Sequence, residues 1–406
     1  MQKTDMKNKI SEKNKYIVFL CLTVFATFFA VWTFTGKWPL LHQPYNSYML
    51  QAQSWLSGRL DIAENYSHLE IAEFNGKYYI SFPPFPSYVM LPFAFLGLTD
   101  CDGVIALVSA IVGAVYAFKL LDLFGIKHDR AFIISLLLTI GSNWLFTAQV
   151  AWVWFIAQNM AFTLSVMALY YALSDKSALA LAFWACAVGC RPLQFLYLPV
   201  ILVLIYKSEK QKNNSITVLE IVKDKWKCVI PMAVIALSYM ALNYARFGNP
   251  IEFGHNYLPE FTESEHGQFS VVYLIDNLKC LLRLPGISFN APWEYQPFNG
   301  TNMFIVSPIF VIYVIYAVRA IIKNDCDRRL VILLAGVIIA ELVAIALHKT
   351  MGGSHFGNRY TNDCLPIVLL SIAYTIPKPE KYDKLCVILL VFGICVNAIG
   401  SELYFG

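Results

Sequence analysis

Charged residues are scarce in this sequence: Asp, Glu, Lys and Arg make up 14% of its 406 residues, whereas hydrophobic residues make up 58%. A water-soluble fold could not bury so much apolar surface and still present a polar exterior. The chain also lacks a glycine-rich phosphate-binding loop, a Cys-x-x-Cys zinc pattern and a repeat of fixed period. The composition excludes an ordinary soluble domain and predicts an integral membrane protein.

The sequence contains apolar runs that are long enough to cross a bilayer. A helix needs about 20 apolar residues to cross the hydrocarbon core, and Tyr16–Thr35 supplies such a run without a charge. Five lysines precede it, but the run is too long for a signal peptide and no small-residue cleavage site follows, so we expect an uncleaved helix with a cytoplasmic N-terminus. Ten further runs, bounded by charges, Pro or Gly, predict eleven spans in all; they are 103–124, 131–147, 153–173, 178–190, 193–206, 228–244, 303–319, 330–347, 364–377 and 385–403.

The positions of Lys and Arg agree with this count. When eleven spans alternate from a cytoplasmic start, 22 of the 31 Lys and Arg residues fall on the cytoplasmic side and 9 fall outside, as the positive-inside rule requires. The net charge of +4 follows from this topology and gives no argument for nucleic-acid binding. We expect one integral membrane domain over residues 1–406, multi-pass in the plasma membrane, with the lipid bilayer as its surroundings.

Two long loops, 37–101 and 248–302, fall on the outer side, whereas most other connections are a few residues long. Because binding and catalytic residues concentrate on loops held by a rigid scaffold, we expect these two loops to cover the functional site. In the first loop, Tyr48, Ala52 and Trp55 have helical spacing, which predicts an amphipathic helix lying on the membrane surface.

The stretch "NGKYYISFPPFPS" follows in the same loop, beginning at Asn75-Gly76. Asn-Gly between two short apolar runs predicts a β-hairpin with a two-residue turn. The prolines after it remove backbone donors and disfavour helix, so we expect them to hold the chain extended. The stretch therefore predicts a rigid aromatic platform above the bundle.

Four stretches carry a resemblance to a known class of proteins: "YMLQAQSWLSGRLDI", "GKYYISFPPFPSYVMLP", "NYARFGNPIEFGHNYLPE" and "GGSHFGNRYTNDCLP". In this order, and all on the outer side, they resemble the GT-C class of membrane glycosyltransferases. The likeness is to the polyprenyl-phosphate-sugar-dependent group, which includes the protein mannosyltransferase and aminoarabinose transferase families. It implies a GT-C-like, all-α polytopic fold of about eleven transmembrane helices with amphipathic surface helices in the outer loops.

The resemblance also implies an activity. A sugar would pass from a polyprenyl-phosphate donor to a glycan, lipid or protein acceptor on the outer face, with inversion and without a cofactor. A carboxylate in the first loop would act as the base, and the usual pattern resembles Asp-Glu shortly after the first helix. This chain has His42-Gln43 at that place, so the candidates for the base are His42, Asp61, Glu70 and Glu73. For Asp61, an ion pair with the neighbouring Arg59 is an equally natural role.

The departing lipid phosphate needs a cation. Arg359 lies at the outer mouth of the expected tenth span, where an arginine near hydrocarbon requires an anionic partner. A lipid phosphate would supply it, although lipid headgroups or Asp363, four residues on, are the simpler partners. Arg191, between two short spans, is the second candidate, and its simpler role is that of an anchor in the outer leaflet.

Aromatic and histidine side chains complete the set of expected binding residues. Tyr360 and His355 belong to the same motif as Arg359. Tyr78 and Tyr79, like Trp293 and Tyr295, could stack on sugar rings or belong to the aromatic belt at the membrane interface.

Other functions find less support in the sequence. No two outer histidines have ligand spacing on one element, so we expect no metal site, and the ten cysteines do not make a disulfide framework. A transporter or flippase of lipid-linked saccharides would show inverted repeats and matching broken helices, which the sequence does not show. A catalytically inactive GT-C-like binding subunit is the remaining alternative, and His42-Gln43 keeps it open.

Overall fold

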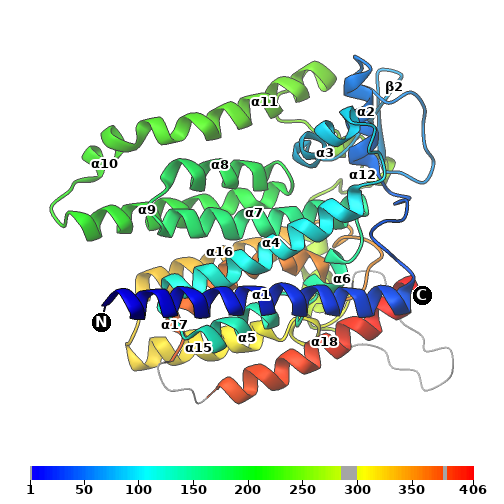
Figure 1. The fold of residues 1–406 in the computed structure, drawn as a ribbon. Helices are drawn as coiled ribbons and strands as arrows, with labels where there is room; N and C mark the ends of the chain where they lie inside the picture. Colours follow the sequence, from blue (N-terminus) through cyan, green and yellow to red (C-terminus); the bar gives the residue numbers. More distant parts are fainter. Residues whose placement is uncertain (1, 285–299, 378–381) are drawn as a thin grey trace.

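The computed structural model of the chain describes residues 2–284, 300–377 and 382–406. Within them the fold is a bundle of α-helices that run mostly along one direction, with a two-stranded sheet at one end (Figure 1). Helix α1 (Gln2–Thr35) runs along the bundle. The N-terminus lies at the end opposite to the sheet, and the C-terminus lies at the same end as the sheet (Figure 1).

Seven helical segments in the described part of the chain are long and apolar enough to cross a membrane, which confirms an all-α polytopic membrane fold. They correspond to seven of the eleven expected spans. They are Ser11–Thr35 of α1, α4 (Asp102–Leu123), α7 (Val153–Leu173), Pro192–Lys212 (η1, Pro192–Tyr197, and α9, Leu198–Lys212), Val218–Phe247 (α10, Val218–Lys225; η2, Trp226–Cys228; and α11, Val229–Phe247), α16 (Arg328–Ala346) and α18 (Asp383–Phe405).

The other four expected spans correspond to shorter helices, because the chain breaks inside or beside them. Ser307 and Pro308, for example, separate two helices of one expected span. The segment 364–377 contains the short α17, which is buried along nearly its whole length. These shorter elements are α5 (His128–Leu138), α6 (Trp144–Ala148), α8 (Ser177–Val188), α14 (Met303–Val306), α15 (Ile309–Lys323) and α17 (Leu365–Thr375).

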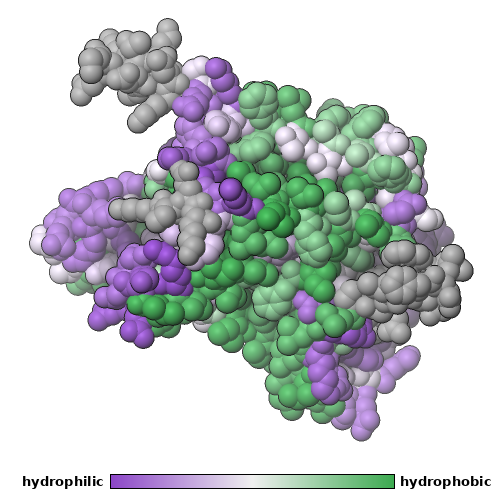
Figure 2. Space-filling model, turned by 90° about the horizontal axis from the view of Figure 1, so that it is seen from below, coloured by the Kyte–Doolittle hydropathy of each residue, from purple (hydrophilic) through white to green (hydrophobic). Residues whose placement is uncertain are grey.

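Burial is graded across the bundle. Helix α7 is central, with 78% of its apolar window buried, and it contacts α4, α8 and α9. The segment Val218–Phe247 is peripheral, with only 6% of its window buried, and α11 lies along the edge against α8 (Figure 1). Figure 2 shows hydrophobic residues across the middle of one face and hydrophilic ones toward its margins, which is the pattern a bilayer requires.

The end of the bundle that carries the sheet, here called the loop end, holds α2 (Ser47–Leu56), the hairpin and α12 (Pro259–Thr262) (Figure 1). Strands β1 (Ile71–Phe74) and β2 (Lys77–Ile80) pair antiparallel with Phe74 opposite Lys77. Asn75 and Gly76 both have positive φ, 51° and 69°, as a primed two-residue turn requires. The predicted hairpin and a helix over Ser47–Leu56 are therefore confirmed, and the position of that helix on the membrane surface stays a prediction. The remaining short elements at this end are η3 (His255–Tyr257), η4 (Val271–Tyr273), α13 (Leu274–Leu282) and η5 (Arg359–Cys364).

The prolines after the hairpin do not keep the chain extended throughout. Residues 81–84 lack regular structure, but α3 (Phe85–Phe95) begins directly after Pro84. Pro86 lies in the first turn of this helix, where the missing N–H would have had no intrahelical acceptor and the fixed φ suits the helix. The expected extended platform is thus wrong beyond residue 84, because these prolines start a helix.

Candidate active site

A cavity of about 390 Å³ lies at the loop end. Both long loops contribute to its lining, the first through Glu70 and Pro83 and the second through His255 and Glu260. The start of α7, the residues 190–193 and the segment 348–360 supply other walls. A concave pocket in which a few polar groups converge among apolar ones is the usual form of a small-molecule site.

Two arginines flank one tyrosine ring in this cavity. The guanidinium carbon of Arg191 lies 4.5 Å from the ring centroid of Tyr360, and that of Arg359 lies 4.6 Å from the same centroid. All three residues line the cavity. The positive groups are attracted to the electron-rich ring, so Tyr360 holds two cations that would otherwise repel each other.

Arg359 is 4% exposed and has no carboxylate partner among the described residues. Its Nε and Nη2 donate to the carbonyl oxygen of Gly352 at 3.1 and 2.7 Å, whereas its Nη1 is buried without a hydrogen-bond partner in the described chain. Gly352 has a φ of +98°, and a Cβ there would lie 2.9 Å from Nε of Arg359. Burial lowers the pKa of Arg359, but a guanidinium stays charged at neutral pH. Arg359 therefore brings to the cavity a positive charge that no carboxylate of the described residues contacts directly.

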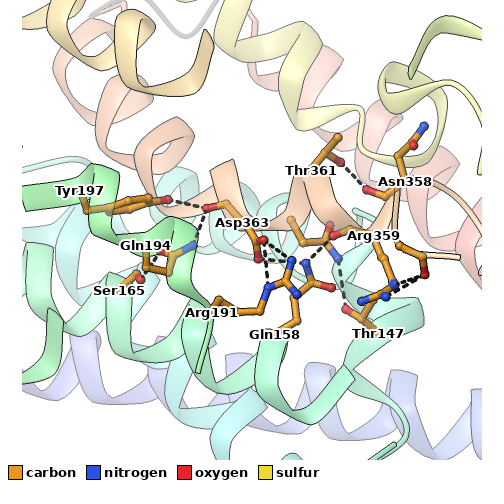
Figure 3. A network of polar contacts seen from close by, with 12 residues as sticks. Thr147, Gln158, Ser165, Arg191, Gln194, Tyr197, Asn358, Arg359, Thr361 and Asp363 are labelled. Atoms are coloured by element: carbon orange, nitrogen blue, oxygen red, sulfur yellow. Dashed lines mark hydrogen bonds and ion pairs between the residues drawn. The ribbon is translucent and has the colours of Figure 1, made fainter. Parts of the chain in front are cut away.

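Asp363, rather than lying next to Arg359, pairs with Arg191. Oδ2 of Asp363 accepts from Nη2 and Nε of Arg191 at 2.8 and 3.1 Å. Nε2 of Gln158 donates to Oδ1 of Asp363 at 2.9 Å and to the carbonyl oxygen of Arg359 at 2.6 Å (Figure 3). The hydroxyl of Tyr197 donates to the backbone carbonyl of Asp363 at 2.6 Å. This network fixes both arginines relative to α7 and η5.

Glu70 is the only one of the four candidate bases that lines the cavity. Nε1 of Trp154, in the first turn of α7, donates to Oε1 of Glu70 at 2.9 Å, and Oγ of Ser81 donates to its backbone carbonyl at 2.9 Å. Burial raises the pKa of Glu70 to about 7, an effect that the hydrogen bond from Trp154 partly opposes. A carboxyl group with a pKa near neutrality is suited to exchange protons at physiological pH.

Two histidines form the wall beside these charges. The rings of His255 and His348 lie 6.3 Å apart, centroid to centroid, and both line the cavity. Burial lowers the pKa of His255 to about 4 and that of His348 to about 3, so both imidazoles are neutral at pH 7. Nε2 of His348 lies 3.1 Å from Nε2 of Gln268. Among the described residues no group of three or more His, Cys, Asp or Glu side chains is arranged to hold a metal ion.

The structure thus brings four of the sequence-predicted site residues into one cavity: Glu70, Arg191, Arg359 and Tyr360. The other three candidate bases lie outside its lining. Nδ1 of His42 lies 2.7 Å from Oδ1 of Asp100, and both side chains are exposed. Oδ2 of Asp61 accepts from Nη2 of Arg59 at 2.8 Å, which is the alternative role expected for it. Glu73 is exposed on β1.

The other predicted binding residues in the described chain do not line the cavity. Tyr79 is buried against Phe247 of α11, with ring centroids 5.1 Å apart. Tyr78 lies opposite Glu73 in the hairpin. His355 is fully buried but does not line the cavity. Trp293 and Tyr295 lie outside the described residues.

Trp154 and Gln158 were not predicted as site residues, because their roles depend on contacts between segments far apart in the chain. Asp363 was expected as a partner of Arg359, but it pairs with Arg191. His255 and Glu260 were within reach, since both lie in the stretch "GHNYLPE" that carries the resemblance. Their place in a stretch that resembles the GT-C class could have marked them as candidate site residues.

The fold has known relatives among solved structures. The chain superposes on ArnT from Cupriavidus metallidurans bound to undecaprenyl phosphate with a TM-score of 0.55 and 13% sequence identity, over 96% of this chain and 76% of ArnT. The apo state of the same ArnT gives a TM-score of 0.53 and 14% identity, over 97% and 76% of the two chains. No family profile and no curated protein sequence matches. ArnT is a GT-C glycosyltransferase, and the chain therefore has the GT-C fold.

Proposed function

We propose that the protein is an inverting glycosyltransferase that moves a sugar from a polyprenyl-phosphate donor to an acceptor at the loop end of the bundle. One observation carries this proposal: a buried arginine with an unpartnered Nη1, Arg359, lines the same cavity as Glu70, a carboxyl group whose pKa is raised to about 7. The first residue suits a phosphate and the second suits a proton transfer. The GT-C fold adds support, since a relative with that fold binds undecaprenyl phosphate.

Arg359 is the residue to which we assign the donor phosphate. Its Nη1 is buried and has no acceptor in the described chain, and a phosphate oxygen would supply one. Arg191 contacts the same Tyr360 ring, lines the same cavity and is held by Asp363. The guanidinium of Arg359 would stabilise the negative charge that develops on the phosphate as its bond to the sugar breaks.

Glu70 is the residue to which we assign the general base. As the acceptor hydroxyl attacks the anomeric carbon, a bond forms between that carbon and the hydroxyl oxygen, and the bond to the phosphate oxygen breaks. The proton of the hydroxyl passes to Glu70, and the electron pair of the broken bond stays on the polyprenyl phosphate. Attack from the side opposite to the leaving group inverts the anomeric configuration.

The sugar would lie among neutral groups. His255, His348 and Gln268 offer donors and acceptors without charge, and Phe253 and Phe269 add apolar surface to the cavity wall. Such a surface suits hydroxyl groups on a ring with an apolar face. The acceptor belongs to one of three classes, a glycan, a lipid or a protein. The loop end would face outward, because the alternation of spans places 22 Lys and Arg residues on the other side.

The test is to incubate the purified protein with membranes that contain a panel of polyprenyl-phosphate sugars and a cell-envelope extract as acceptor. We expect release of polyprenyl phosphate from one donor and a glycoside whose anomeric configuration, determined by NMR, is opposite to that of the donor. Binding of polyprenyl phosphate without release from any donor would contradict the transferase and favour an inactive binding subunit. Movement of an intact donor across vesicle membranes would favour a flippase.

A further inference from the structure

The two arginines beside Tyr360 do not contribute two full positive charges, because one of them is paired with a carboxylate. Arg191 and Arg359 both stack on this ring, but Asp363 makes two contacts with Arg191 and none with the guanidinium of Arg359. The carboxylate therefore cancels one of the two positive charges. Arg191, Arg359 and Asp363 together carry a net charge of about one positive unit.

Asp363 is placed to act through Arg191 and not on a ligand. It is 2% exposed and is absent from the cavity lining, whereas Arg191 is part of that lining. Its second carboxylate oxygen accepts from Gln158, and its backbone carbonyl accepts from Tyr197. The side chains that meet there come from α7, η1 and η5 (Figure 3). These contacts hold the carboxylate of Asp363 in a fixed position beside Arg191.

The two phosphates of the proposed reaction differ in charge. The donor is a phosphodiester and carries one negative charge, whereas the released polyprenyl phosphate is a monoester and carries about 1.5 to 2 at pH 7. A subsite with two uncompensated arginines would match the product better than the donor. A subsite with one uncompensated arginine matches the donor. Glu70 and Glu260 line the same cavity and, when ionised, favour the less charged phosphate further.

We infer that Asp363 is a positioning residue that limits the charge of the phosphate subsite, so that the subsite accepts the phosphodiester donor and releases the phosphomonoester product. The inference rests on the proposed function, because it takes the cavity to bind a polyprenyl phosphate. It adds that the preference between donor and product is set by a residue that touches neither.

The experiment compares two ligands of the full-length protein in detergent micelles at pH 7.5. One is undecaprenyl phosphate, a monoester, and the other is its methyl ester, a diester of the same chain length with a single charge. In the Asp363→Asn variant we expect the monoester to bind on the order of tenfold more tightly, and the diester to gain less, because an added charge acts in proportion to the ligand charge. Turnover should fall as product release slows, whereas KM for the donor should not rise.

A double variant covers the case in which a lone buried Arg191 prevents folding. Arg191→Gln/Asp363→Asn removes the ion pair as a unit, which proteins often tolerate, and leaves the net charge of the subsite unchanged. We expect its monoester-to-diester affinity ratio to equal that of the wild type. Asp383→Asn, which disturbs the Arg130–Asp383 pair elsewhere in the bundle, is the matched control and should change neither affinity.

Two outcomes would overturn the inference: an unchanged monoester-to-diester affinity ratio in Asp363→Asn, whether both ligands bind more weakly or more tightly, or a lower ratio in the double variant. The last would mean that the cation of Arg191 acts on the ligand in spite of its partner. Failure of the wild-type protein to bind either phosphate would instead contradict the proposed function itself, so the two failures are distinguishable.

Discussion

Trp154 donates a hydrogen bond of 2.9 Å to Glu70, although the two residues are 84 positions apart in the chain. Trp154 lies at the start of α7, the most buried of the membrane-spanning helices, and Glu70 lies in the loop just before β1. The contact holds the loop before β1 against helix α7. It also places the carboxyl group where burial raises its pKa to about 7.

The pH dependence of transfer follows from this contact. Because burial disfavours the ionised form of Glu70, the carboxylate predominates only above about pH 7. We therefore expect turnover to rise with pH through a midpoint near 7 and then to level off. His255 and His348, with pKa values of about 4 and 3, stay neutral over this range and add no second limb.

The Trp154→Phe variant tests whether Glu70 is the group whose ionisation gives the rise of turnover with pH. The hydrogen bond from the indole lowers the pKa of Glu70, so its loss should raise the pKa and move the midpoint to higher pH. The pH–rate profiles of the two proteins give the comparison. An acid limb near pH 4.5, or a midpoint that does not move, would mean that another group is the base.

Arg359→Ala should abolish transfer while the protein remains folded. The side chain brings to the cavity a positive charge without a direct carboxylate contact, and its Nη1 has no acceptor in the described chain. Arg359→Lys should restore only part of the activity, because an ammonium group is a point charge and lacks the two-pronged geometry of a guanidinium. Turnover and thermal melts in detergent should be measured together. Full activity of the alanine variant would rule out this role.

The segment before α3 should affect turnover more than stability. Pro83 lines the cavity, and the backbone N–H of Phe85 donates to the carbonyl oxygen of Gly189 at 2.9 Å, two residues from Arg191. Replacing Pro83 and Pro84 by Ala loosens this connection, and displacements of about 1 Å can cost on the order of 100-fold in rate. We expect slower transfer with an unchanged melting temperature. Wild-type turnover would show that the segment is only a connector.

The orientation of the bundle can be tested by labelling in intact cells. Asn213 is exposed in the connection between α9 and α10, and this connection lies at the end opposite to the loop end (Figure 1). A cysteine at this position should resist an impermeant thiol reagent. A cysteine at Glu263, exposed just after α12, should react. The reverse pattern would place the cavity in the cytoplasm and contradict transfer on the outer face.

Local patterns predicted the parts of the fold that depend on local physics. The charge-free run 16–35 lies within one long helix, and Asn75-Gly76 forms the expected turn, because length, apolarity and positive φ are properties of a few adjacent residues. The prolines near residue 84 were misjudged for the same reason: Pro is disfavoured inside a helix but favoured in its first turn, and only the structure shows where α3 begins.

The site was predictable only in part, because its chemistry depends on distant contacts. Arg359 stood out as an arginine at a membrane mouth. That Glu70 and not Asp61 lines the cavity could not be predicted from sequence, since the position of Glu70 depends on its contact with Trp154, 84 positions away. The local pairing of Asp61 with Arg59 was an expected alternative. The pairing of Asp363 with Arg191, 172 positions away, was equally out of reach.

The role of Glu70 as the base can be tested by measuring the release of polyprenyl phosphate from the lipid-linked donor by Glu70→Gln, beside the wild type and Glu73→Gln. Glu73 lies three residues on, is exposed on β1 and is the matched control. A general base contributes roughly 100- to 10,000-fold to a rate. We expect Glu70→Gln to lose a factor of that size in the rate of release, and Glu73→Gln to release polyprenyl phosphate at close to the wild-type rate. Undiminished release by Glu70→Gln would contradict the role of Glu70 as the general base.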